Sequence, residues 1–165
     1  MIYLLDILKR HKVMGTPDSF YILQKEEGKK LPLVRLNNEK GKFCYLSISE
    51  NLKYLLSKGF LSRDKRDLLI HISIDGLPLF KSSSVTLWPI LMKVMDSTYC
   101  HPLPLGVFCG VGKPNLDNFI SDISKEIKLL SNDFSIDGVF IILKDVTFIC
   151  DAPARAFVQG LKFIY

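Results

Sequence analysis

Leu68-Leu69-Ile70-His71-Ile72-Ser73-Ile74-Asp75-Gly76 is the stretch of sequence that decides the fold class. Its later apolar positions alternate with polar ones and β-branched residues are frequent, which is typical of a strand with one buried face. Asp75-Gly76 predicts a turn, and residues 77–81 are expected to leave that turn as a second strand. The stretch therefore predicts an apolar strand that ends in an aspartate.

A second apolar run ends in the same way. Residues 138–150 are extended and apolar, and Asp151 stands directly after them. Residues 152–161 predict a helix, because Pro153 is well placed in a first helical turn. Each of the two predicted strands is thus followed directly by an aspartate.

The residues between these two strands predict one more strand and two helices. Residues 103–111 read as a strand, and residues 115–130 carry apolar side chains at helical spacing. Residues 85–95 contain Trp88-Pro89 and predict a short helix, since proline suits a first turn. On the helix at 115–130 the residues expected on the solvent face are Asp122, Lys125, Glu126 and Lys128. The fold class that follows is α/β, a mixed sheet with flanking helices.

The first part of the chain has a less regular pattern. Short apolar runs are broken by charged and turn-forming residues. Residues 49–56 predict a short amphipathic helix, which Gly59 ends. We therefore expect residues 1–65 to form an irregular N-terminal arm and residues 66–165 to form the core.

Composition is compatible with contact with nucleic acid. The 165 residues include 22 Lys and Arg against 17 Asp and Glu, a net charge of +5, and the isoelectric point is near 9.0. Apolar residues make up 48%, and a mean hydropathy of +0.20 is high for a protein that stands alone in water. Self-association is the corresponding expectation.

Several other classes are disfavoured. The four cysteines have no zinc-site spacing, and no signal peptide or membrane-spanning run is recognisable, so an intracellular location with reduced thiols is expected. The glycines of residues 106–112 lack Walker spacing, and Pro114 follows the lysine, which argues against a nucleotide-binding loop. No small-molecule substrate and no membrane partner are predicted.

Asp75 and Asp151 are the candidate catalytic and metal-binding residues. If their strands are neighbours, the two carboxylates meet and provide the hard oxygen ligands that Mg²⁺ and Mn²⁺ prefer. The alternative interpretation is structural, with Asp75 in a turn and Asp151 as a helix cap. Arg155 has two interpretations as well, contact with a phosphate or pairing with a carboxylate.

Three phrases carry a resemblance to a known family. They are residues 72–83 (ISIDGLPLFKSS), 87–90 (LWPI) and 148–157 (FICDAPARAF). Together they resemble the transposase-derived proteins of animal genomes that are related to the CACTA (En/Spm) transposases. The resemblance covers about residues 66–165. It implies an RNase H-like core with a DDE-type site, in which Asp75 matches the first acidic residue and Asp151 the second.

The resemblance also carries expectations about function. The complete family performs metal-dependent phosphodiester hydrolysis and strand transfer on DNA in the nucleus, and a third acidic residue that follows the second completes its metal site. That residue has no match before Tyr165, and Asp117, Asp122 and Glu126 precede Asp151. We therefore expect a fragment or relic of a transposase. The alternative is a non-catalytic, transposon-derived module that binds nucleic acid or protein.

Overall fold

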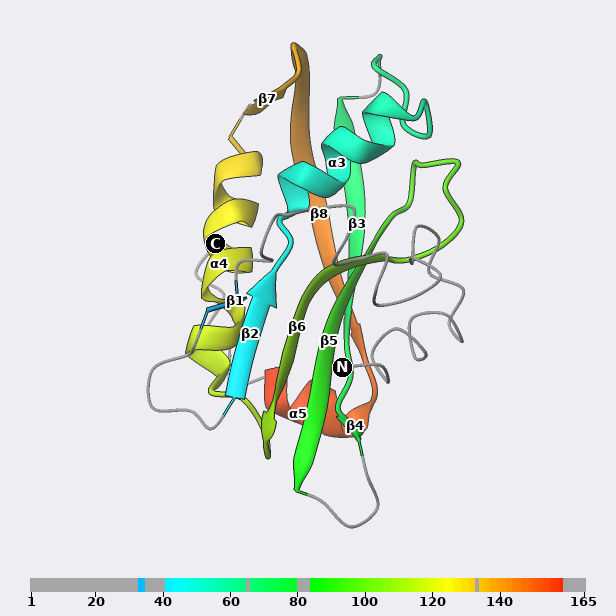
Figure 1. Cartoon of the computed structure of the whole chain (residues 1–165). Helices are drawn as coiled ribbons and strands as arrows, with labels where there is room; N and C mark the ends of the chain where they lie inside the picture. Colours follow the sequence, from blue (N-terminus) through cyan, green and yellow to red (C-terminus); the bar gives the residue numbers. More distant parts are fainter. Residues whose placement is uncertain (1–32, 35–40, 65, 80–83, 133, 159–165) are drawn as a thin grey trace, which may run out of the picture.

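A mixed β-sheet organises the structure, a computed structural model that describes residues 33–34, 41–64, 66–79, 84–132 and 134–158 (Figure 1). The strands follow the order β1-β2-β6-β5-β3-β8-β7, and β4 pairs with β5. The strands are β1 (Leu33–Val34), β2 (Gly41–Tyr45), β3 (Asp67–Ile74), β4 (Leu77–Pro78), β5 (Val85–Val94), β6 (Leu103–Val111), β7 (Phe134–Ile136) and β8 (Val139–Cys150), and the helices are α3 (Ile48–Ser57), α4 (Leu116–Leu130) and α5 (Ala152–Val158). The predicted α/β class is confirmed at this level.

Strand β3 lies inside the sheet, between β5 and β8. It pairs with β5 in the antiparallel sense and with β8 in the parallel sense. Its burial alternates as its sequence predicts, with the buried side chains Leu68, Ile70, Ile72 and Ile74. A strand placed centrally in this way is held by hydrogen bonds along both edges, so its end is well fixed.

Asp75-Gly76 does not reverse the chain, and the predicted turn there is wrong. Ile74 pairs with Ile90 of β5, and Leu77 pairs with Leu87, so both strands advance by the same three residues. Strands β3 and β4 are therefore one extended path with an interruption at Asp75-Gly76. The chain reverses after Leu79, whose amide donates to the Val85 carbonyl at 3.1 Å.

The helix predicted for residues 85–95 is also wrong, because β5 is a strand. Its side chains alternate in burial, with Trp88, Ile90, Met92 and Val94 on the core face, and the apolar spacing is two rather than three or four. The prediction of a helix depended on Pro89, because proline also suits a first helical turn. Proline cannot donate to a sheet ladder, but the constant register sets Pro89 opposite Asp75, where the pairing is already interrupted.

Strand β8 contains a β-bulge. Leu68 pairs with Leu143, and the next residue of β3, Leu69, pairs with Asp145. Lys144 is thus the extra residue of the bulged strand. Before the bulge the odd-numbered side chains up to Leu143 are buried, and after it the even-numbered ones up to Cys150 are the less exposed. The predicted strand at 138–150 is confirmed, with this change of phase inside it.

All three helices pack on one face of the sheet and share a single core with it. Strand β6 and helix α4 match their predicted ranges closely. Phe119 of α4 contacts Phe43 of β2, Phe108 of β6 and Phe157 of α5, with ring centroids 5.3, 6.4 and 6.3 Å apart. This aromatic group joins the sheet to α4 and α5.

Strand β2 and helix α3 belong to the same core, although they precede residue 66. Strand β2 pairs with β6, and α3 contributes the fully buried Ile48, Leu52 and Leu55. The predicted helix at 49–56 is confirmed, with Ser47 as its cap and Gly59 at a φ of 70° after its end. Residue 65 therefore does not mark a break in the core. The remainder of the predicted arm, residues 1–32 and 35–40, lies outside the described residues.

Among the described helices, none combines the length and apolar character required to span a membrane.

Candidate functional site

The parallel pairing of β3 and β8 brings Asp75 and Asp151 to the same end of the sheet. Ile74 and Cys150 are register partners, and they are the last residues of their strands. Each candidate aspartate is the next residue along the chain. Because neighbouring strands lie about 4.8 Å apart, the two aspartates leave adjacent strands at the same level. Figure 1 shows the β3–β4 junction and α5 together at this end of the sheet.

Both aspartates are exposed to solvent, and Asp151 also caps α5. Its Oδ1 accepts a hydrogen bond from the Ala154 amide at 2.8 Å, and its carbonyl oxygen accepts one from the Arg155 amide at 2.7 Å. The structural interpretation of Asp151 is therefore confirmed. It does not exclude a second role, because a carboxylate has two oxygens and about four lone-pair positions.

The charges of Asp151, Arg155 and Asp75 all act on the pKa of the Cys150 thiol. Burial raises the pKa of Cys150, and a hydrogen bond with the Ile74 backbone lowers it. The carboxylates of Asp151 and Asp75 also raise this pKa, while the Arg155 guanidinium lowers it. Cys150, the last residue of β8, lies at the same end of the sheet as Asp75 and Asp151.

An aromatic layer supports this end of the sheet. Trp88 is only 5% exposed, and its ring lies 5.0 Å from that of Phe157 on α5. Gly76 packs directly on the indole, where an added Cβ would stand 2.6 Å from a ring carbon. The indole Nε1 donates to the Thr86 hydroxyl at 3.2 Å. The strand end after Asp75 and the helix after Asp151 therefore rest on the same side chain.

Two exposed carboxylates are suitable ligands for a small hard cation. Mg²⁺ typically takes one or two protein carboxylates, keeps several waters, and exchanges some of these for substrate phosphate oxygens. Asp75 and Asp151 fit that ligand set by type and by exposure. The described residues contain no group of three or more His, Cys, Asp or Glu side chains arranged to hold a metal ion.

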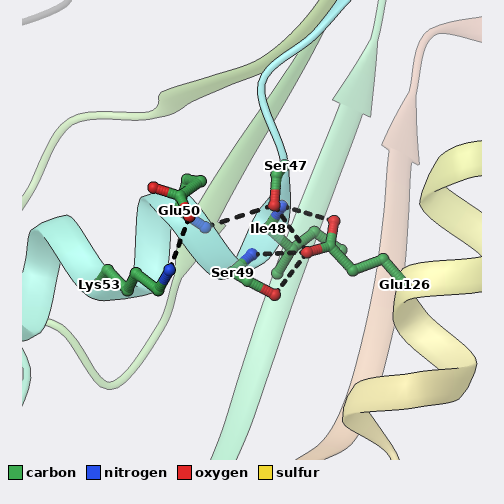
Figure 2. Close-up of polar contacts among 6 residues, drawn as sticks. All are labelled: Ser47, Ile48, Ser49, Glu50, Lys53 and Glu126. Atoms are coloured by element: carbon green, nitrogen blue, oxygen red, sulfur yellow. Dashed lines mark hydrogen bonds and ion pairs between the residues drawn. The ribbon is translucent and has the colours of Figure 1, made fainter. Parts of the chain in front are cut away.

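The sequence predicts Glu126 on the solvent face of α4, and this prediction is wrong. Figure 2 shows its carboxylate against the first turn of α3. It accepts hydrogen bonds from the Ser47 and Ser49 hydroxyls at 2.7 and 2.5 Å, from the Ile48 and Ser49 amides at 2.8 Å, and from the Tyr45 hydroxyl. Glu126 lies seven residues after Phe119 and four before Leu130, which are both buried side chains of α4. This helical spacing places Glu126 beside the buried stripe and is the sequence signal for its position.

These contacts give Glu126 a structural role. Burial raises the pKa of Glu126, but the hydrogen bonds from Ser49, Tyr45 and Ser47 outweigh burial and leave the pKa below its ordinary value. The carboxylate is therefore charged, and it satisfies amides at the start of α3 that have no partner within that helix.

The remaining candidates have simpler surroundings. Asp122 pairs with Lys125 at 3.3 Å on the surface of α4, and Asp117 lies in the first turn of that helix. His71 is a sheet residue, as expected, with Lys93 and Thr147 as register partners. All four cysteines are free thiols.

No protein-family model matches the chain, and no curated protein matches it.

Proposed function

We propose that this chain carries the first part of an RNase H-like, DDE-type transposase core, in which Asp75 and Asp151 are the first two acidic residues of a metal-dependent site. The observation that carries the proposal is the parallel pairing of Ile74 with Cys150. It sets the two aspartates at the same level on neighbouring strands, which is what two ligands of one cation require.

The sheet topology supports the RNase H-like part of the proposal. Three consecutive antiparallel strands, the β3–β4 path, β5 and β6, are followed by α4 and then by β8, which returns beside β3 in the parallel sense. Asp75 lies at the interruption of the first of these strands, directly after β3, and Asp151 directly follows the last, β8. Helix α5 then begins at once after Asp151.

In the proposed reaction, Asp75 and Asp151 would hold Mg²⁺ or Mn²⁺ through carboxylate oxygens. A bound divalent ion would supply Lewis acidity for cleavage of a DNA phosphodiester and for strand transfer. The protein contributes position and charge. β3 and β8 fix the spacing of the carboxylates, and the hydrogen bond from the Ala154 amide orients that of Asp151. A third carboxylate, expected from the family resemblance, would complete the ligand set.

A non-catalytic module is the second candidate function. It is favoured by the cap that Asp151 provides for α5, which accounts for this aspartate without a metal ion. In this case Asp75 only marks the interruption between β3 and β4, and Asp151 only caps α5. The fold would then bind nucleic acid or another protein through other surfaces.

A thermal melting experiment separates the two functions. The purified chain is melted with increasing Mn²⁺, next to Asp75→Asn, Asp151→Asn and the control Asp64→Asn, whose exposed carboxylate precedes β3. Asparagine is also a good helix cap, so Asp151→Asn keeps α5 capped. An ion that binds only the folded state stabilises it by about 2.7 kcal/mol at a hundred times its dissociation constant.

The proposal expects a rise of roughly 5 to 10 °C in the melting temperature at that saturation. The rise is lost in Asp75→Asn and in Asp151→Asn and is retained in Asp64→Asn. Binding is expected in the millimolar range, since two carboxylates give an incomplete ligand shell. A melting temperature that is indifferent to Mn²⁺ would rule out the metal site and favour the non-catalytic module.

A further inference from the structure

We propose that Arg155 is the phosphate-binding residue of the Asp75–Asp151 site, where its guanidinium holds a backbone phosphate of the nucleic acid. This inference rests on the proposed function and adds to it the group that receives the anionic substrate. Helix α5, which carries Arg155, begins directly after Asp151.

The position of Arg155 is fixed by the helix that follows β8. Its amide donates to the Asp151 carbonyl at 2.7 Å, which closes the first turn of α5. Ala154 and Val158 are the buried side chains of this helix, whereas Arg155 is exposed. Arg155 therefore lies one helical turn after Asp151 and is open to solvent.

Arg155 forms no ion pair with another residue in the described part of the chain. The ion pairs there join Lys53 to Glu50, Lys125 to Asp122 and Lys144 to Asp67. An exposed arginine one helical turn after Asp151, without an ion pair to it, is available for an external anion. A guanidinium is suited to this role, because its planar fork matches two phosphate oxygens.

The charge balance of the site gives the reason for such a residue. Two carboxylates repel a DNA phosphate, and a divalent ion offsets that repulsion only when it is bound. A fixed cation next to the carboxylates lets the phosphate approach in either case. Arg155 is therefore expected to set nucleic-acid affinity, and the aspartates are expected to set metal affinity.

The test compares DNA binding by the full chain, Arg155→Gln, Arg155→Lys and the control Arg66→Gln. Arg66 is also exposed, but it directly precedes β3. It therefore lies at the opposite end of that strand from Asp75, roughly 30 Å away along the strand. Binding of a short fluorescein-labelled DNA duplex is followed by anisotropy over a series of salt concentrations, with and without Mg²⁺.

The expected result is an affinity about tenfold lower in Arg155→Gln than in the unmodified chain at the same salt concentration. The slope of log affinity against log salt should fall by about 0.9, the value for one lost phosphate contact. Arg155→Lys should keep the slope, because the charge remains, and should lose only part of the affinity. Arg66→Gln should change the affinity less than Arg155→Gln.

Equal losses in Arg155→Gln and Arg66→Gln would overturn the inference, because they would reflect net charge alone. Absence of DNA binding by the unmodified chain would overturn it as well. The Mn²⁺ melting experiment distinguishes these outcomes from failure of the proposed function. Arg155→Gln should retain the metal-dependent rise, which a collapse of the site would abolish. If the rise depends on both aspartates but DNA affinity is indifferent to Arg155, only the role of Arg155 is wrong.

Discussion

Gly76 lies against the indole ring of Trp88 so closely that one additional methyl group has no room. The nearest ring carbons would be 2.6 and 2.8 Å from an added Cβ, and Trp88 is buried against Phe157. The glycine that follows Asp75 is therefore required by packing, not by a chain reversal. This requirement links the candidate site to the core.

Gly76→Ala is expected to lower the free energy of unfolding by about 1 to 3 kcal/mol, the usual cost of overpacking. Chemical denaturation followed by far-ultraviolet circular dichroism measures this loss, because that signal does not depend on Trp88, the single tryptophan of the chain. Trp88→Phe provides the matched background, since it removes the ring atoms that an alanine would meet. Should Gly76→Ala cost the same in both backgrounds, the contact with the indole is not the reason for the glycine.

The locations of some functional and structural side chains could be predicted from the sequence, and those of others could not. The carboxylates at the strand ends were predicted because each follows a long apolar run, and the pairing of β3 with β8 brings those ends together. Glu126 was assigned to solvent because charge was given more weight than its place on the helix. Its partners, Tyr45, Ser47 and Ser49, lie more than seventy residues away in the chain, and no local pattern announces them.

Between secondary-structure elements, the closest polar connection is the one that joins α4 to the beginning of α3. The Glu126 carboxylate takes the place of an external anion at the first turn of α3 (Figure 2). Ser47 caps the same helix through its hydroxyl, which accepts from the Glu50 amide at 3.3 Å. One charged side chain and its donors thus join these two helices.

Glu126→Gln should destabilise the fold by about 2 kcal/mol at neutral pH, because hydrogen bonds to a charged group are lost and their donors stay buried. The pKa of Glu126 is lower in the folded chain than its ordinary value. Its carboxylate therefore stabilises the fold above the unfolded pKa of about 4.3, and this contribution is lost as the pH falls through the folded pKa.

Denaturation of the unmodified chain and of Glu126→Gln at a series of pH values measures this effect. The difference in unfolding free energy between the two should shrink as the pH falls below about 4. Glu50→Gln is the control, because Glu50 is an exposed glutamate of the same region, paired with Lys53 at 2.8 Å, and should change stability by less than about 0.5 kcal/mol. A difference that does not depend on pH would contradict the ionised state of Glu126.

The elements themselves were predictable where one periodicity ran through the whole segment. Helix α4 and strands β3 and β6 fall in this group. Strand β5 was mistaken for a helix because Pro89 was given more weight than the alternation around it. Pro89 is tolerated because the neighbouring strand is interrupted at Asp75-Gly76. Residues 85–95 alone carry no sign of that interruption.

Across the chain as a whole, the core extends over both sides of residue 65. Leu52 of α3 is fully buried together with residues of β3, β5 and β6. The sequence predicts a boundary here because the pattern of apolar runs is less regular before residue 65, and that local pattern does not record that β2 extends the sheet from β6. Long-range pairing of this kind is a property of the fold and leaves little local trace.

Leu52→Ala should therefore destabilise the structure that surrounds Trp88, on a different segment of the chain. A loss of about 2 to 5 kcal/mol is expected for a fully buried leucine, and it should appear in the denaturation midpoint reported by Trp88 fluorescence. Lys53→Ala, at the next and more exposed position of α3, should have little effect. A midpoint unchanged by Leu52→Ala would indicate that α3 unfolds separately from the sheet.

The bulge at Lys144 determines how the sheet accommodates changes of chain length. The side chains on the core face change from odd to even numbers at this point, so β8 has absorbed one surplus residue without moving Asp151 from its place beside Asp75. Loss of a residue at the bulge would restore a regular strand and leave the end of β8 where it is. Loss of a residue between Asp145 and Cys150 would instead turn the final residues to the opposite face and withdraw the second aspartate from the first. A deletion in this strand is thus tolerated at the bulge and disruptive after Asp145.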